Sequence, residues 1–151
     1  VAWAGGISGL FAAGALIYAF YANYFVRRFG EYRLAVAGGC LMAFAFAVYW
    51  FSSVWYWGVL ASILSGLGYY LLHAVLQTHA TQMAPAIRGT AVALFASFLF
   101  FGQSVGVILA SVAVDHLDLA AVFPIGIFGL PILAIVFAWR LQKRQALQAS
   151  A

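Results

Sequence analysis

The sequence predicts an all-α protein, a polytopic membrane helix bundle of about five transmembrane helices, and three observations lead to this fold class. Hydrophobic residues make up 67% of the 151 residues and charged residues only 7%, whereas soluble domains are about 25% charged. The mean hydropathy is +1.05. The apolar residues fall into runs that reach the roughly 20 residues of a spanning helix. Because so few charges cannot cover a water-facing surface, we expect a multi-pass protein of the lipid bilayer.

Composition also excludes several classes of function. The net charge of +4 does not indicate a nucleic-acid partner, because the basic residues lie only between the apolar runs and after the last one. The single Cys40 excludes an internal disulfide or a cysteine metal cluster. Asp115, His116 and Asp118 share one short turn, which leaves a metal's coordination incomplete. We therefore predict no enzyme, no cofactor, no metal and no nucleic acid.

The first two helices are expected over about residues 1–22 and 34–51, joined by a basic loop at residues 24–33. Gly30 supplies the turn in this loop. The loop contains the basic residues Arg27, Arg28 and Arg33. They indicate either a positive-inside anchor or a functional loop.

The third helix is expected over about residues 54–83 and carries polar side chains within an apolar run. One stripe, spaced by three or four residues, contains Gly66, Tyr70, His73, Gln77 and Thr81. Buried polar side chains in a bilayer are costly and usually functional. The plainer alternative is that they form hydrogen bonds that fix helix packing.

The remaining chain is expected to form two more helices and a tail. Pro85 ends the third helix, and the fourth runs over about 90–114. The fifth runs over about 119–139, so we assign residues 1–140 to the membrane bundle and 141–151 to a cytoplasmic tail. Basic residues occupy the first loop, the third loop and the tail, while the second loop has none and the fourth is acidic. Since Lys and Arg stay cytoplasmic, the amino end is predicted outside and the carboxyl end in the cytoplasm.

The stretch from Gly66 to Ala110 resembles the tenth and eleventh helices of the major facilitator superfamily, and within it the bacterial drug- and sugar-efflux permeases. The residues that carry the resemblance are the turn Pro85…Arg88-Gly89-Thr-Ala and then Gly102-Gln103-Ser104 with Gly106. The halves of this family have six helices each. The resemblance makes the five expected helices its eighth to twelfth, so that the chain is a carboxyl-terminal fragment.

The first loop is similar to the family's cytoplasmic motif, Gly-x-x-x-Asp-Arg-x-Gly-Arg-x-Arg. Arg28, Gly30 and Arg33 fit this motif. Three residues depart from it, namely Asn23 for the leading glycine, Arg27 for the aspartate and Glu31 for an arginine. The lost aspartate argues against a charge-relay role for the loop.

The resemblance implies a secondary transporter that moves a small organic solute by alternating access, with efflux as the family's direction. The substrate-cavity candidates are Tyr18, Tyr70, His73, Gln77, Gln103 and Ser104. The alternative for Gln103 and Ser104 is that their polar groups satisfy each other. The alternative for Tyr18 and Tyr70 is an ordinary packing or interfacial role. The candidate gating residues of the cytoplasmic loops are Arg28, Gly30, Arg33, Arg88 and Gly89. Arg88 is alternatively a plain topology signal.

The resemblance further implies partners and a location. The missing amino-terminal half-bundle completes the cavity, and protons are a candidate coupling ion, carried by His73 or by a carboxylate in that half. The expected location is the bacterial inner membrane. The alternative, from a different class of protein, is a small membrane subunit or assembly factor that is complete at five helices and does not transport.

Overall fold

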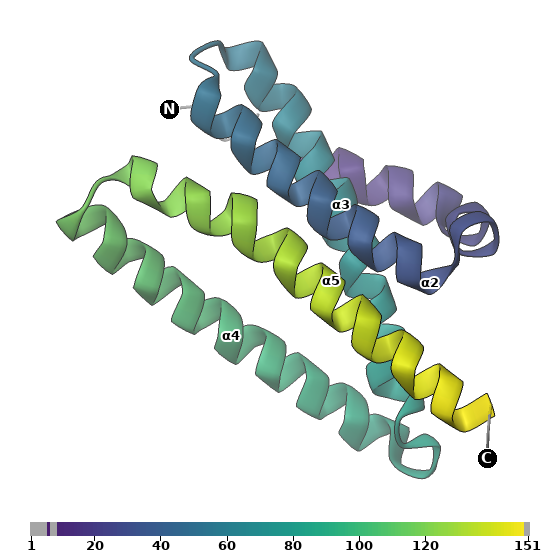
Figure 1. Cartoon of the computed structure of the whole chain (residues 1–151). Coiled ribbons are helices and arrows are strands. Elements are labelled where there is room, and N and C mark those ends of the chain that lie inside the picture. The colour runs from purple at the N-terminus through teal and green to yellow at the C-terminus, as the bar shows by residue number, and fades with distance from the viewer. Residues whose placement is uncertain (1–5, 7–8, 150–151) are drawn as a thin grey trace.

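The chain folds into long helices that run back and forth in a bundle (Figure 1). The computed structural model describes residue 6 and residues 9–149, and this part contains helices and no strand. The long helices are α2 (Phe11–Phe51), α3 (Trp55–Gln82), α4 (Arg88–His116) and α5 (Val122–Ala149). Two short 3₁₀ turns, η1 (Pro85–Ile87) and η2 (Leu119–Ala121), precede α4 and α5. The beginning of the helix expected over residues 1–22 lies outside the described residues.

Within the described residues, four helices are long and apolar enough to cross a membrane. α3 has 28 residues and α4 has 29. At 1.5 Å per residue each is about 40 Å long, which exceeds the roughly 30 Å of a hydrocarbon core. These lengths are compatible with the predicted membrane helix bundle.

The expected loop at residues 24–33 is wrong, because the chain there is helical on both sides of Gly30. Gly30 alone leaves helical geometry inside α2, with φ 74° and ψ 162°. This backbone conformation is open essentially to glycine. The chain reverses at this residue, so that α2 consists of two arms (Figure 1). The described part of the helix expected over 1–22 lies in the first arm and the helix expected over 34–51 lies in the second, and the turn between them is much tighter than the expected loop.

α5 also extends beyond its expected end, because it continues to Ala149 through most of the stretch expected as a tail. The residues after Trp139 are mostly Arg, Leu, Gln, Lys and Ala, which are good helix formers. Leaving the bilayer removes the apolar pattern but does not end the helix. α4 begins and ends within two residues of its expected bounds.

The core joins the second arm of α2 to α3 and α5. Its buried side chains are Leu34, Ala35, Leu71, Leu72, Val75, Ala134, Ala138 and Leu141. Small residues allow this close approach: a Cβ on Gly38 would lie 2.7 Å from the carbonyl oxygen of Gly68, and one on Gly68 would lie 2.8 Å from that of Gly38. Such steps drive helix association in membranes, where lipid provides no hydrophobic force between helices.

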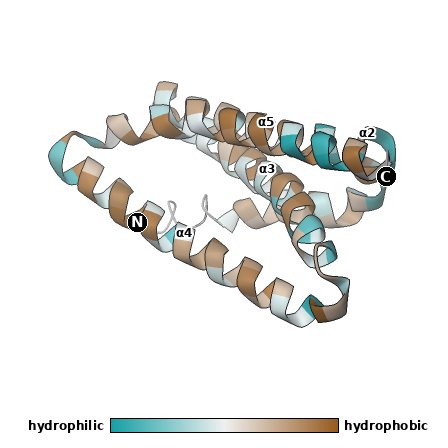
Figure 2. Cartoon of the chain, turned by 60° about the horizontal axis from the view of Figure 1, so that its bottom comes forward, coloured by the Kyte–Doolittle hydropathy of each residue, from teal (hydrophilic) through white to brown (hydrophobic). Residues whose placement is uncertain are grey.

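α4 stands apart from this core. None of the residues of α4 is buried. In the most apolar 18-residue stretch of each helix, 0% of the residues are buried in α4 and 39% in α3. Figure 2 shows that α4 is nonetheless apolar along most of its length. α4 is therefore a spanning helix whose apolar sides are left for lipid or for other helices to cover.

The turns fall into two groups at opposite ends of the bundle (Figure 1). The turn of α2, the α3–α4 turn and the carboxyl end of α5 lie at one end, which we call the basic end. The α2–α3 and α4–α5 turns lie at the other. Every Lys and Arg of the sequence lies at or near the basic end, and Asp115 and Asp118 lie at the opposite one.

Candidate functional site

Three of the predicted cavity residues come together in the structure. Tyr18, on the first arm of α2, stacks on Tyr70 of α3 with ring centroids 6.4 Å apart and planes 24° from parallel. Tyr70 meets the imidazole of His73 edge to face, at 6.5 Å and 76°. One turn of α3 therefore presents an aromatic ring and an imidazole beside a helix that is distant in sequence.

Three further rings join this group and were not predicted, and two of them contact His73 directly. Tyr69 stacks on His73 at 5.2 Å and 11°, and Phe95 of α4 lies 5.6 Å from it. Phe11 of α2 lies 5.7 Å from Tyr69. We call this group the aromatic cluster, and its members are Phe11, Tyr18, Tyr69, Tyr70, His73 and Phe95. Tyr69 could have been found from its spacing, because it lies four residues before His73, whereas Phe95 could not, because it belongs to another helix.

Two buried polar atoms on α3 have no hydrogen-bond partner among the described residues, namely Nδ1 of His73 and Oγ of Ser65. Ser65, Tyr69 and His73 are spaced by four and therefore lie on one face of the helix. A buried polar atom without a partner costs about 1–3 kcal/mol. This face can therefore gain free energy from any group that supplies the missing hydrogen bonds.

The other three predicted cavity residues lie outside the cluster. Gln77 is exposed on α3, one turn beyond His73. Gln103 and Ser104 are exposed on α4. The Ser104 hydroxyl donates a hydrogen bond to the Phe100 carbonyl at 2.9 Å, so the alternative that Gln103 and Ser104 satisfy each other is not what the structure shows.

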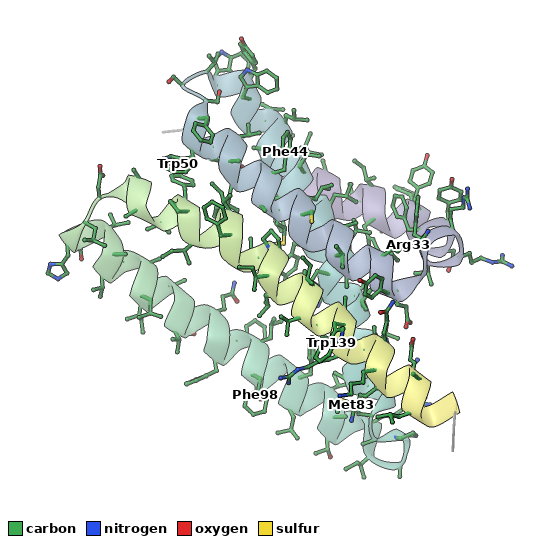
Figure 3. The ribbon with its side chains drawn as sticks, in the orientation of Figure 1. Arg33, Phe44, Trp50, Met83, Phe98 and Trp139 are labelled. Atoms are coloured by element: carbon green, nitrogen blue, oxygen red, sulfur yellow. The ribbon has the colours of Figure 1, made fainter. Side chains whose placement is uncertain are left out.

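The predicted gating residues gather at the basic end, in two places. Arg28, Gly30 and Arg33 lie at the turn of α2, and both arginines are exposed. Figure 3 shows Arg33 close to this turn. Arg88 and Gly89 begin α4 after the short turn η1, and both are exposed.

An ion pair that the sequence did not predict joins α2 to α3 at this end. The Nε2 atom of His79 lies 2.7 Å from Oε2 of Glu31, and the two side chains are 22% and 31% exposed. The only signal in the sequence was charge: Glu31 is an acid among arginines, and His79 lies near the same end of α3. The pair connects the residue after Gly30 to the last turns of α3.

A cavity of about 680 Å³ lies next to this ion pair. Its polar lining is Glu31, His79, Gln82, Arg140, Arg144 and Gln145, and its apolar lining is Leu76, Ala80, Met83, Phe95, Phe137 and Leu141. Phe95 thus contacts the aromatic cluster and also lines the cavity. None of the six predicted cavity residues lines it.

Comparison with known proteins identifies the family. The sequence model described as Major Facilitator Superfamily matches residues 1–150. Searches of curated proteins and of solved structures found no match. The family match covers nearly the whole chain, and the helices have the length and apolar composition of membrane spans. It confirms the resemblance seen in the sequence at the level of the superfamily: this chain is a multi-pass membrane protein that belongs to the Major Facilitator Superfamily of transporters.

Proposed function

We propose that the chain is the carboxyl-terminal part of a transporter that moves a small organic solute out of the cell by alternating access. The solute binds beside the aromatic cluster, between this chain and an amino-terminal half-bundle. The cluster offers ring faces from Tyr18, Tyr69 and Tyr70 and a hydrogen-bonding atom on His73. The matching solute carries a flat or apolar ring and at least one polar group.

The observation that carries this proposal is the unpartnered Nδ1 of His73, held among rings in a helix of membrane-spanning length. Polar groups at membrane depth are expensive and mark solute or ion pathways. A structural histidine would have its ring nitrogens satisfied by neighbouring helices. Here Tyr69 stacks on the ring and Phe95 contacts it at a tilt of 45°, and neither gives Nδ1 a hydrogen bond.

The loose packing of α4 supports a rocking movement. α4 has no buried residue, and its ring contact with α3 is the one between Phe95 and His73. A shift of α4 therefore changes the cover of the aromatic cluster without opening the core of α2, α3 and α5. The uncovered apolar sides of α4 are the surface that the amino-terminal half would cover.

The orientation follows from the charges at the two ends. The basic end faces the cytoplasm of a bacterial inner membrane, because Lys and Arg remain on that side. Protons are the proposed coupling ion. Glu31 is the one acid within α2 and α3 and lies at the basic end, so a coupling carboxylate near the membrane midplane comes from the amino-terminal half.

The test is transport by the full-length protein in intact cells. Cells that produce it are compared with cells that do not, and the accumulation of a panel of aromatic and heteroaromatic solutes is measured by mass spectrometry. We expect at least one solute to accumulate less when the protein is present. His73→Ala should restore its accumulation, whereas the control His116→Ala, an exposed histidine at the end of α4, should leave export unchanged.

Two results would overturn the proposal. One is a panel in which no solute responds to the protein, which would favour a membrane subunit without transport activity. The other is a His73→Ala protein that exports as well as the unaltered one. Membrane abundance of each variant is measured by immunoblot, so that lost export is separated from lost protein.

A further inference from the structure

The cavity at the basic end has a charge distribution that the proposed solute pathway does not use. Arg140 and Arg144 line it from α5, one helical turn apart and therefore on one face. Among the described residues no salt bridge involves either arginine. The one acid that lines the cavity is Glu31, and its carboxylate is occupied by His79 at 2.7 Å. Neither guanidinium group therefore has a carboxylate within ion-pair distance in the part of the chain that the structure describes.

A neighbouring lysine shows that this arrangement is specific to the two arginines. Lys143 lies between them in the sequence but does not line the cavity. Its Nζ lies 5.6 Å from the centre of the Trp139 ring instead, and Figure 3 shows Trp139 on α5 before the basic segment. Three basic residues on one helix end thus divide into two that face the cavity and one that packs along the outside.

The rest of the lining is suited to an apolar chain. Leu76 and Met83 of the α3 end, Phe95 of α4, and Phe137 and Leu141 of α5 form its apolar wall. Figure 3 shows Met83 at the α3 end close to α5. The volume of about 680 Å³ lies in the range of small-ligand sites, about 300–1,000 Å³. One ligand can therefore place an anionic group on the arginines and an apolar part against Phe95 and Phe137.

We propose that this cavity binds the phosphate group of an acidic phospholipid, with Arg140 and Arg144 as its anchors. Guanidinium groups match phosphate oxygens in paired hydrogen bonds. The amides of Gln82 and Gln145, which also line the cavity, can donate to the same headgroup. The arginines lie at the basic end, where α5 leaves the bilayer. The headgroup of a lipid at this membrane surface therefore meets the polar wall, and its acyl chains meet the apolar wall. The site is separate from the aromatic cluster, with Phe95 as the residue common to both.

Native mass spectrometry of the full-length protein tests this site. The protein is purified in detergent with an equal mixture of phosphatidylglycerol and phosphatidylcholine, and the lipid retained by each variant is counted. We expect preferential retention of phosphatidylglycerol, reduced about tenfold in the double variant Arg140→Gln, Arg144→Gln. The control Lys143→Gln removes one positive charge from the same end of the same helix and should retain the lipid. Size-exclusion chromatography shows whether each variant is folded.

A gain-of-binding variant keeps the test decisive. Glu31→Gln removes the one acid of the lining, and we expect retention to rise about threefold, which misfolding cannot produce. Equal loss in Lys143→Gln and in the arginine double variant would overturn the proposal, because it would indicate attraction to surface charge only. Equal competition by glycerol phosphate would also overturn it, because a free phosphate compound would then be the ligand and the apolar wall would have no part.

Discussion

His79 Nε2 lies 2.7 Å from Glu31 Oε2, so the end of α3 is tied to the turn of α2 by an ion pair between residues 48 positions apart. The pair follows directly after Gly30, where the chain reverses. It therefore fixes the start of the second arm of α2, directly beside the reversal, against the last turns of α3.

The first prediction concerns the ion pair itself. Glu31→Gln and His79→Ala should each lower the melting temperature of the full-length protein in detergent, because each leaves a half-buried partner without its charge-assisted hydrogen bond. We expect each change to lower the free energy of unfolding by about 1 kcal/mol. The double variant should melt no lower than the more damaging single variant. Additive losses would show that the two residues act independently.

The second prediction concerns the reversal at Gly30. Gly30→Ala should reduce the folded yield and lower stability by about 1–3 kcal/mol, because φ 74° and ψ 162° exclude a Cβ. The position is otherwise open, with nothing within 4 Å of an added Cβ. Gly89→Ala is the matched control, since Gly89 lies inside α4 and is equally open. It should be neutral or slightly stabilising. Fluorescence-detected size exclusion measures both, and equal behaviour of the two variants would contradict a special role for Gly30.

The third prediction concerns Tyr69, which contacts His73 through ring stacking at 5.2 Å and 11°. Tyr69→Phe keeps the ring and should preserve export, whereas Tyr69→Ala should weaken apparent solute affinity by about threefold to tenfold. Tyr56→Ala, at an exposed tyrosine near the start of α3, is the control. Dose–response curves of export in cells provide the measurement. If Tyr69→Phe weakens apparent solute affinity as much as Tyr69→Ala does, the hydroxyl and not the ring stacking is the important feature.

The fourth prediction concerns orientation. In a background with Cys40→Ala, Ser52→Cys places a thiol in the α2–α3 turn and Lys143→Cys places one on α5 at the basic end. A membrane-impermeant maleimide should label Ser52→Cys in intact cells and Lys143→Cys only after permeabilisation, because the basic end is expected in the cytoplasm. The reverse pattern would invert the proposed topology.

The candidate site could be read from the sequence only in part. Tyr18, Tyr70 and His73 are candidates from the sequence because polar side chains are costly in an apolar run, and the structure brings all three into one cluster. The same cost makes Gln77 and Gln103 candidates, and the structure places both outside the cluster. Helical spacing places a residue on a face of its own helix, but it does not say which helix that face meets.

What the sequence by itself determined is the class of protein and the approximate positions of its helices. Hydropathy is a local property, so apolar runs, the breaks between them and the basic residues at alternate turns can be read one segment at a time. Only the tertiary structure decided that the chain reverses on Gly30 alone, that Glu31 pairs with His79, and that Phe95 packs on His73. These features depend on the rotation and angle of each helix against its neighbours. Side-chain packing fixes both, and no single segment contains that information.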